Sequence, residues 1–144
     1  MSITENLTRI RADVESAAHG RDVTLLAVSK TFGVDAIDEA IAAGQRAFGE
    51  NYVQEGVEKV KYFKAKYPEM DIEWHMIGPL QSNKTRLVAE HFDWVQSVDR
   101  EKIAKRLSEQ RPEDLPDLNI LIEVNVDLED SKSGVGIDEV EELL

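Results

Sequence analysis

The stretch LLAVSKTFGV, residues 25–34, decides the fold class. Four consecutive apolar residues, Leu25 to Val28, are followed by a single lysine, Lys30, and by a turn at Gly33. An apolar run without alternation is typical of a strand that is covered on both faces, which favours a parallel sheet. We therefore expect a buried strand from Val23 to Ser29, with Lys30 as the first residue beyond it.

The rest of the chain alternates between strand and helix patterns. The expected strands cover residues 23–29, 46–49, 72–77, 94–98 and 118–126. The expected helices cover residues 2–18, 34–44, a segment through 53–60, 83–91 and 101–110, with a last one beginning in GIDEVEELL. Strands that alternate with helices indicate parallel βα units, in either an open doubly wound sheet or a (β/α)8 barrel.

Two observations favour the barrel. A doubly wound sheet that binds a dinucleotide carries a glycine-rich first turn, and here that turn reads SKTFG. A complete barrel takes about 250 residues. We therefore expect an α/β fold, a TIM (β/α)8 barrel of which residues 1–144 form the N-terminal part, about the first five βα units of one domain.

The composition narrows the function classes. The hydrophobic content of 42% indicates one globular domain. The net charge of −12 argues against binding to nucleic acid or to an anionic membrane, because either partner would be repelled. There is no cysteine, so disulfides and thiolate sites are excluded. The first twenty residues carry no signal-peptide pattern and no apolar run is long enough to span a membrane, so we expect a cytoplasmic protein.

Lys30 occupies the edge where parallel α/β folds bind ligands. From its position alone two interpretations stay open. The side chain extends its ammonium to solvent from the rim, or it is a nucleophile whose amine, with a pKa lowered by apolar neighbours, attacks a carbonyl.

The other strand ends carry polar residues as well. Asn51 is expected to cap the following helix together with Gln54, three residues later. His75 alternates with Trp74 and Met76, so only one of these sets faces the barrel interior. A lone strand histidine with no H-x-x-H pattern and no carboxylate expected to pair with it predicts no metal site.

Two further segments are polar. Ser82 or Asn83 is expected to cap the next helix, and Lys84 in its first turn opposes the helix dipole, which suggests an anionic partner. The loop after the fifth strand places Lys132 between two serines, in a segment that either holds an anion or is mobile.

Four motifs in this order, LLAVSKT, FGENYVQE, WHMIGPLQSNK and SKSG, resemble the pyridoxal-phosphate homeostasis protein family, which is related to the barrel domain of alanine racemase. The resemblance covers nearly the whole chain. It implies a single-domain TIM barrel that holds pyridoxal 5'-phosphate (PLP) as a Schiff base on Lys30, in a protein of vitamin B6 and amino-acid homeostasis. It further implies that the cofactor phosphate is held by loops late in the barrel, beyond this sequence.

The resemblance also implies the remaining site residues. The cofactor face would be lined by Asn51, by His75 or Met76, and by Ser82, Asn83 and Lys84, with Lys132 as an accessory lysine. The implied partners are the cofactor itself and PLP-dependent apoenzymes that receive it, and the full-length protein is expected to be a monomer.

Two enzymatic functions are the alternatives to a cofactor carrier without turnover. A PLP-dependent amino-acid racemase needs a second acid/base group opposite the lysine. The tyrosines Tyr52, Tyr62 and Tyr67 lie on one expected helix or at its end and are expected to serve packing. A Schiff-base aldolase without cofactor would need only Lys30.

Overall fold

The computed structural model describes residues 2–126 and 133–144. The strands are β1 (Ala27–Val28), β2 (Ala47–Glu50), β3 (Glu73–Met76), β4 (Trp94–Val98) and β5 (Asn119–Ile122). The α-helices are α1 (Ile3–Ala18), α2 (Val34–Ala42), α3 (Val53–Lys66), α4 (Thr85–His91), α5 (Glu101–Gln110) and α6 (Val140–Leu143). Single 3-10 turns at Ser82–Lys84 and Ile137–Glu139 precede α4 and α6.

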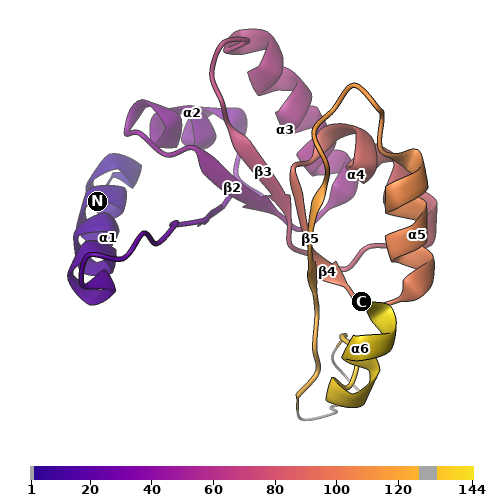
Figure 1. The fold of residues 1–144 in the computed structure, drawn as a ribbon. Coiled ribbons are helices and arrows are strands. Elements are labelled where there is room, and N and C mark those ends of the chain that lie inside the picture. Colours follow the sequence, from indigo (N-terminus) through magenta and orange to yellow (C-terminus); the bar gives the residue numbers. More distant parts are fainter. Residues whose placement is uncertain (1, 127–132) are drawn as a thin grey trace.

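All five strands form one parallel sheet in the order β1-β2-β3-β4-β5. The spatial order equals the order in the sequence, so every crossover moves in the same direction, and the sheet curves through the molecule (Figure 1). A doubly wound sheet reverses its direction at a switch point, whereas a barrel does not. The sheet therefore has the arrangement expected for the first five βα units of a barrel.

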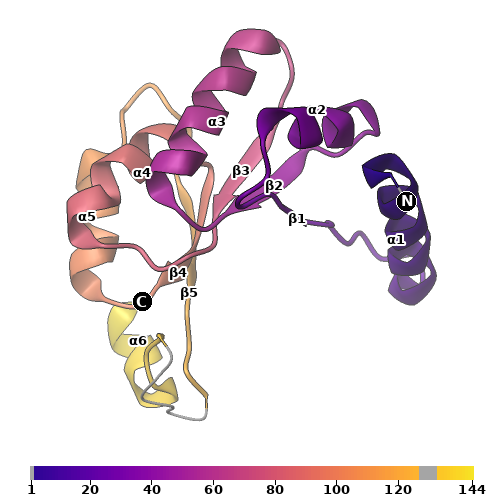
Figure 2. The same ribbon diagram turned by 180° about the vertical axis from the view of Figure 1, so that it is seen from behind.

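Helices α2, α3, α4 and α5 lie on one side of the sheet, and the core fills the space between them and the strands (Figure 2). Trp74 and Met76 of β3 are 1% and 0% exposed, and the Trp74 ring lies 5.3 Å from that of Phe48 on β2. Burying a large apolar side chain stabilises the fold by roughly 1.5–3 kcal/mol. This layer therefore supplies most of the favourable burial and fixes the strands that carry the site.

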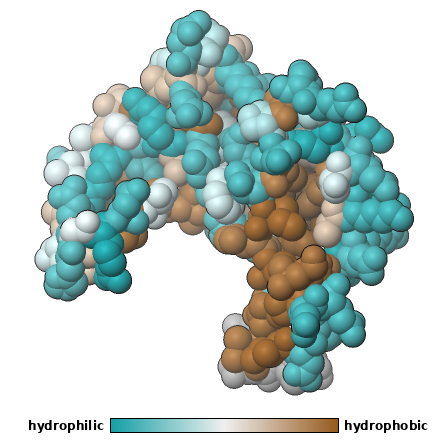
Figure 3. Space-filling view, in the orientation of Figure 1, coloured by the Kyte–Doolittle hydropathy of each residue, from teal (hydrophilic) through white to brown (hydrophobic). Residues whose placement is uncertain are grey.

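The edge strand β5 exposes apolar side chains on both of its faces. The consecutive residues Ile120 and Leu121, whose side chains alternate between the two faces, are 43% and 47% exposed. A continuous apolar area is visible on the concave side of the molecule, near β5 and α6 (Figure 3). Among the described helices, none has the length and apolar character needed to cross a membrane.

β1 is shorter than expected. The predicted strand from Val23 to Ser29 pairs as a strand only at Ala27–Val28, and Val28 is 49% exposed, so the expectation of a strand covered on both faces is wrong here. The cause is a side chain. Gln45 Nε2 donates to the Leu25 carbonyl at 2.7 Å and to the Ala47 carbonyl at 2.8 Å, so the amide satisfies the Leu25 carbonyl, which a neighbouring strand would otherwise bind.

β5 is also shorter than expected, because it covers Asn119–Ile122 of the predicted residues 118–126. Several other boundaries follow local signals closely. The Ser2 hydroxyl caps α1 by accepting from the Glu5 amide at 3.0 Å, and the helix ends at His19 in a left-handed conformation with φ of 51°. β4 and α5 have the predicted bounds. The apolar stripe of α1 is buried at Leu7, whereas Ile10 remains 40% exposed.

Candidate functional site

Backbone hydrogen bonds tie the carboxyl ends of the strands together at one edge. The Ser29 amide donates to the Gly49 carbonyl at 2.9 Å, and the Ile77 amide donates to the Glu50 carbonyl at 2.9 Å. At β4 the Ser97 hydroxyl donates to the Gly78 carbonyl at 2.6 Å. The residues that follow β1, β2 and β3 are therefore neighbours in space, as the ligand edge of a barrel requires.

Lys30 lies at this edge, two residues after Val28, the last residue of β1. Its side chain is exposed to solvent. This exposure agrees with the first of the two interpretations, an ammonium at the solvent-facing rim, and the burial among apolar neighbours named in the second is not found, because the short β1 leaves this segment at the rim. An exposed amine is accessible to a carbonyl compound, so the position fits the nucleophile interpretation without apolar burial.

Asn51 does not cap α3. Tyr52 is the capping residue and no side chain caps the helix, so the expected capping box with Gln54 is wrong. Asn51 lies just outside the helix instead. Its Oδ1 is buried and has no hydrogen-bond partner in the described part of the chain. A buried acceptor without a donor costs about 1–3 kcal/mol, so a donor brought to this oxygen would stabilise the protein.

The backbone of Asn51 lies directly against Gly78, which is in the loop after β3. A Cβ atom on Gly78 would lie 2.3 Å from the Asn51 carbonyl oxygen, a distance that no side chain can occupy. Only glycine allows the two loops to approach this closely. The pair Asn51 and Gly78 therefore joins the ends of β2 and β3 into one surface.

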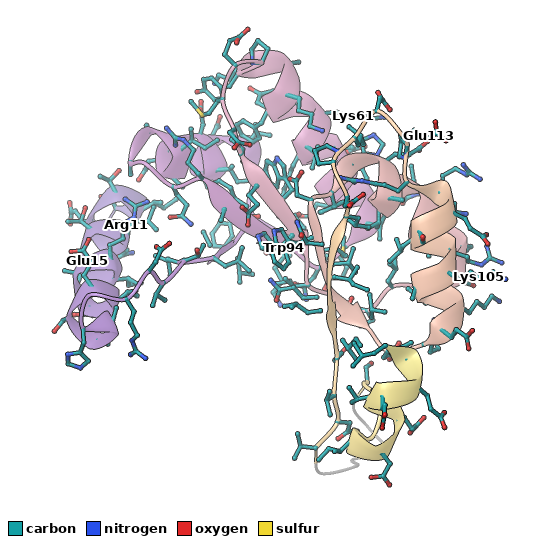
Figure 4. All side chains as sticks on the ribbon, viewed as in Figure 1. Arg11, Glu15, Lys61, Trp94, Lys105 and Glu113 are labelled. Carbon is teal, nitrogen blue, oxygen red and sulfur yellow. The ribbon has the colours of Figure 1, made fainter. Side chains whose placement is uncertain are left out.

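His75 and Met76 lie on opposite sides of β3. Met76 has no exposed surface and packs in the core against the helices, so of the two expected residues it is the one that does not line an open face. His75 is 7% exposed, and its ring stacks on Trp94 of β4 at 5.4 Å with an interplanar angle of 6°. Figure 4 shows Trp94 on the side of the sheet away from α5.

Both ring nitrogens of His75 have partners. Its Nε2 lies 2.5 Å from Glu73 Oε1, and its Nδ1 lies 2.9 Å from Gln96 Nε2. A carboxylate only accepts and the amide nitrogen only donates, so a neutral ring with its proton on Nε2 satisfies both contacts. The expectation that no carboxylate pairs with this histidine is wrong, since Glu73 lies two residues away on the same side of the strand.

Ser82, Asn83 and Lys84 form the 3-10 turn before α4, and neither of the first two caps a helix. Ser82 and Lys84 are half-buried, and Asn83 is exposed. In the described part of the chain no carboxylate lies within ion-pair distance of Lys84. The predicted role of Lys132 concerns a residue outside the described ranges.

The tyrosines differ in their surroundings. Tyr67 donates its hydroxyl hydrogen bond to Asp38 and stacks on Phe63 at 6.2 Å, as expected for a packing residue. Tyr62 is 43% exposed and also packs edge-on against Phe63, with ring centroids 4.9 Å apart. Tyr52 is 56% exposed, so the packing interpretation is wrong for this residue. Tyr52 lies just after β2, at the same edge of the sheet as Lys30.

A buried charged cluster beneath the strand ends was missed by the sequence analysis. Lys59 of α3 donates to Glu50 of β2 at 3.0 Å and to Glu55 at 2.8 Å. Glu55 and Lys59 are four residues apart with the acid first, the favourable order on a helix, and this was the available signal. The hydrogen bond from Lys59 holds the pKa of Glu55 below its usual value, and a second hydrogen bond from the Thr31 amide acts in the same direction.

Comparison with known proteins gives a consistent family. The sequence profile described as "Alanine racemase, N-terminal domain" matches residues 2–144. The chain is 63% identical over 139 residues to the pyridoxal phosphate homeostasis protein of Vibrio cholerae, covering 93% of this chain and 59% of the relative. It is 56% identical over 146 residues to the protein of the same name from Escherichia coli K12, covering 98% and 62%.

Solved structures agree with the fold. The chain resembles PipY of Synechococcus elongatus PCC7942 with PLP bound, at a TM-score of 0.75 and 36% identity, over 99% of this chain and 64% of that one. The structure of PipY without PLP gives a TM-score of 0.81 at 37% identity, with the same coverage. The chain thus spans about three fifths of the length of the relatives it matches, and the predicted barrel fold of the alanine-racemase type is confirmed.

Proposed function

Because the chain belongs to the alanine racemase N-terminal domain family, we propose that it binds PLP and acts in the homeostasis of that cofactor. The observation that carries the proposal is the identity of 63% and 56% to two pyridoxal phosphate homeostasis proteins. The PLP-bound structure of PipY, 36% identical over 99% of this chain, supports the same ligand. The proposal extends to the whole protein, of which we infer residues 1–144 to be the N-terminal part of one barrel domain.

The residues at the strand ends fit such a ligand. Lys30 offers an exposed primary amine at the carboxyl edge of β1. At the end of the neighbouring strand, Asn51 Oδ1 is a buried acceptor without a donor among the described residues, the kind of atom that a polar ligand group satisfies. The half-buried Lys84 carries a positive charge with no carboxylate partner in the described ranges, which suits an anionic ligand.

Each of these residues has a distinct proposed role. PLP supplies an aldehyde carbon, which a primary amine converts to a C=N bond with release of one water molecule. Lys30 provides that amine, so that the cofactor is held as a Schiff base. Asn51 accepts a hydrogen bond from a polar group of the ligand. His75 is held by its contacts with Glu73 and Gln96, and its ring lines the proposed cofactor face.

Ser82, Asn83, Lys84 and Lys132 belong to the same proposal as polar neighbours of the cofactor. Met76 is left out, because it has no surface that a ligand could touch. We further propose that the full-length protein is a cytoplasmic monomer that passes PLP to apoenzymes.

The absorbance spectrum of the purified full-length protein tests the proposal. A lysine-bound PLP absorbs in the violet, and the protein is expected to gain this band on titration with PLP. A protein that shows no band and no binding contradicts the proposed function. A Schiff-base aldolase would instead act on an aldehyde substrate without added PLP and therefore without the violet absorbance band.

A racemase is the second candidate, because Tyr52 is exposed at the same edge as Lys30. A racemase would interconvert L- and D-alanine rapidly when PLP is added. We expect no such conversion at an enzymatic rate, since a PLP-binding homeostasis protein requires only binding of the cofactor. A rapid conversion by the wild type that is lost in Tyr52→Phe would establish the racemase instead.

A further inference from the structure

A cluster of charged side chains from α3 contacts the backbone on both sides of Lys30. Lys59 Nζ donates to the Ser29 carbonyl at 2.7 Å, and it also donates to Glu50 Oε1 and Oε2 at 3.0 and 3.1 Å. Glu55 Oε1 accepts from Lys59 Nζ at 2.8 Å and from the Thr31 amide at 2.6 Å. One helix therefore reaches both neighbours of Lys30.

The two backbone groups are those of the peptide units that flank Lys30. The Ser29 carbonyl belongs to the peptide unit that enters Lys30, and the Thr31 amide belongs to the unit that leaves it. Lys59 and Glu55 are hydrogen-bonded to each other, so their contacts with the Ser29 carbonyl and the Thr31 amide form one continuous set of hydrogen bonds around Lys30, called the bracket below. Both dihedral angles of Lys30 are confined by this bracket, which limits the directions available to its Cα–Cβ bond.

The conformation of Thr31 supports the same view. Thr31 has a φ of 64°, in the left-handed region that β-branched residues rarely adopt. Such a conformation persists only where the surroundings hold it. Two interactions hold this residue before α2. One is the turn hydrogen bond from the Phe32 amide to the Ser29 carbonyl at 3.2 Å, and the other is the contact from the Thr31 amide to Glu55.

The bracket is anchored in a rigid part of the molecule. The side chain of Lys59 is 7% exposed and that of Glu50 is 0% exposed, and the Ser29 hydroxyl also donates to Glu50. The side chain of Glu55 is 31% exposed. A buried ion pair with additional hydrogen bonds keeps a single geometry. Glu50 of β2 therefore fixes the position of Lys59, and Lys59 in turn fixes the Ser29 carbonyl.

We infer that Lys59 and Glu55 are positioning residues for Lys30, which orient its backbone for attachment of PLP without touching the cofactor. This inference rests on the proposed function, since it concerns the reactivity of Lys30 toward PLP. An ion pair that merely stabilises the fold would leave that reactivity unchanged once the protein is folded.

Glu55→Ala is the variant of choice, because Glu55 is partly exposed and its removal leaves the buried pair Lys59–Glu50 intact. Glu55→Gln is the conservative variant. It loses the charge but keeps an oxygen that accepts from the Thr31 amide. Lys66→Met is the matched control on the same helix, since Lys66 pairs with Asp38 and not with the segment around Lys30.

Two measurements on the full-length protein separate the outcomes. Without PLP, amide hydrogen exchange at Thr31 is expected to become about tenfold faster in Glu55→Ala, because a hydrogen bond to a charged group is lost. With PLP, trapping by borohydride is expected to show attachment at Lys30 about tenfold slower in Glu55→Ala, since orientation is lost. Glu55→Gln should keep hydrogen exchange at Thr31 and the rate of PLP attachment close to the wild-type values, and Lys66→Met should match the wild type in both.

The contrary results are equally specific. Attachment at the wild-type rate in Glu55→Ala, or unchanged exchange at Thr31, overturns the positioning role while the proposed function stands. An equal loss of attachment rate in Glu55→Ala and Lys66→Met would also overturn the positioning role, because the loss would then not depend on contacts with the segment around Lys30. A wild-type protein that attaches no PLP at Lys30 overturns the proposed function itself.

Discussion

Lys59 Nζ of α3 lies 3.0 Å from Glu50 Oε1 of β2, and both side chains are withdrawn from solvent. The pair connects the helix layer to the end of β2 and, through the Ser29 carbonyl, to the end of β1. Buried ion pairs are sensitive to the loss of one partner, because the remaining charge is left without compensation. This relationship therefore links the stability of the fold to the geometry of the site.

Lys59→Met is expected to lower the free energy of unfolding by about 3–5 kcal/mol, since it leaves the Glu50 carboxylate buried and unpaired. The double variant Glu50→Gln with Lys59→Met should lose less, because no unpaired charge remains. Lys66→Met removes an exposed pair with Asp38 and should change the free energy of unfolding far less than Lys59→Met does. Urea denaturation of the full-length variants measures all three. A double variant less stable than Lys59→Met would contradict the explanation.

Lys30 is expected to be the attachment point of PLP. Borohydride reduction followed by peptide mapping should place the pyridoxyl mass on Lys30, and Lys30→Ala should abolish the violet absorbance. The reason is position, since Lys30 is an exposed amine two residues beyond β1, at the carboxyl edge of the sheet. A label found only on Lys84 or Lys132 would refute the assignment.

Asn51→Ala is expected to affect binding and folding differently. Removing Oδ1 deletes a buried acceptor that has no partner among the described residues, so the free energy of unfolding without ligand should stay within about 1 kcal/mol of the wild type. The dissociation constant for PLP should rise about tenfold, because the hydrogen bond to the ligand is lost. Denaturation and PLP titration measure the two quantities. Asn6→Ala on α1 is the control, and equal PLP affinity in all three proteins would show that Oδ1 does not contact the ligand.

The contribution of Glu55 to stability is expected to depend on pH. The hydrogen bond from Lys59 lowers the pKa of Glu55 in the folded protein relative to the unfolded chain. A lowered pKa means that the stabilisation is present above the unfolded value and is lost as the pH falls through the folded value. The difference in unfolding free energy between wild type and Glu55→Gln should therefore be constant near neutral pH and shrink below about pH 4. Urea titrations across this range test the sign, and a difference that grows with acidification would contradict it.

The polypeptide of residues 1–144, expressed alone, is expected to associate with itself. Ile120 and Leu121 are 43% and 47% exposed on β5, and Figure 3 shows a continuous apolar area near β5 and α6. β1 and β5 are the edges of the sheet, and unpaired strand edges promote association. Size-exclusion chromatography should show oligomers, and Leu121→Lys should shift the distribution toward the monomer. A wild-type polypeptide that elutes as a monomer and melts cooperatively would contradict this expectation.

Several elements could be predicted from local patterns alone. The bounds of β4 and α5 agree with the structure, and the end of α1 follows from His19 and Gly20. The parallel sheet follows from the apolar run at residues 25–28, even though its pairing is shorter than expected. These predictions succeed because hydrophobic periodicity and capping depend on residues close together in the chain.

The site required contacts that no local pattern contains. The sheet brings the residues of the site together from distant parts of the sequence. Examples are the pairing of His75 with Gln96 and the bracket of Lys59 and Glu55. The Oδ1 of Asn51, which has no partner among the described residues, also owes its burial to the tertiary structure. Sequence placed Lys30 after a strand, because the end of an apolar run is visible in one dimension. Only the tertiary structure decided what holds Lys30 there, because buried charges and polar atoms are satisfied by whichever strand or helix lies beside them in space.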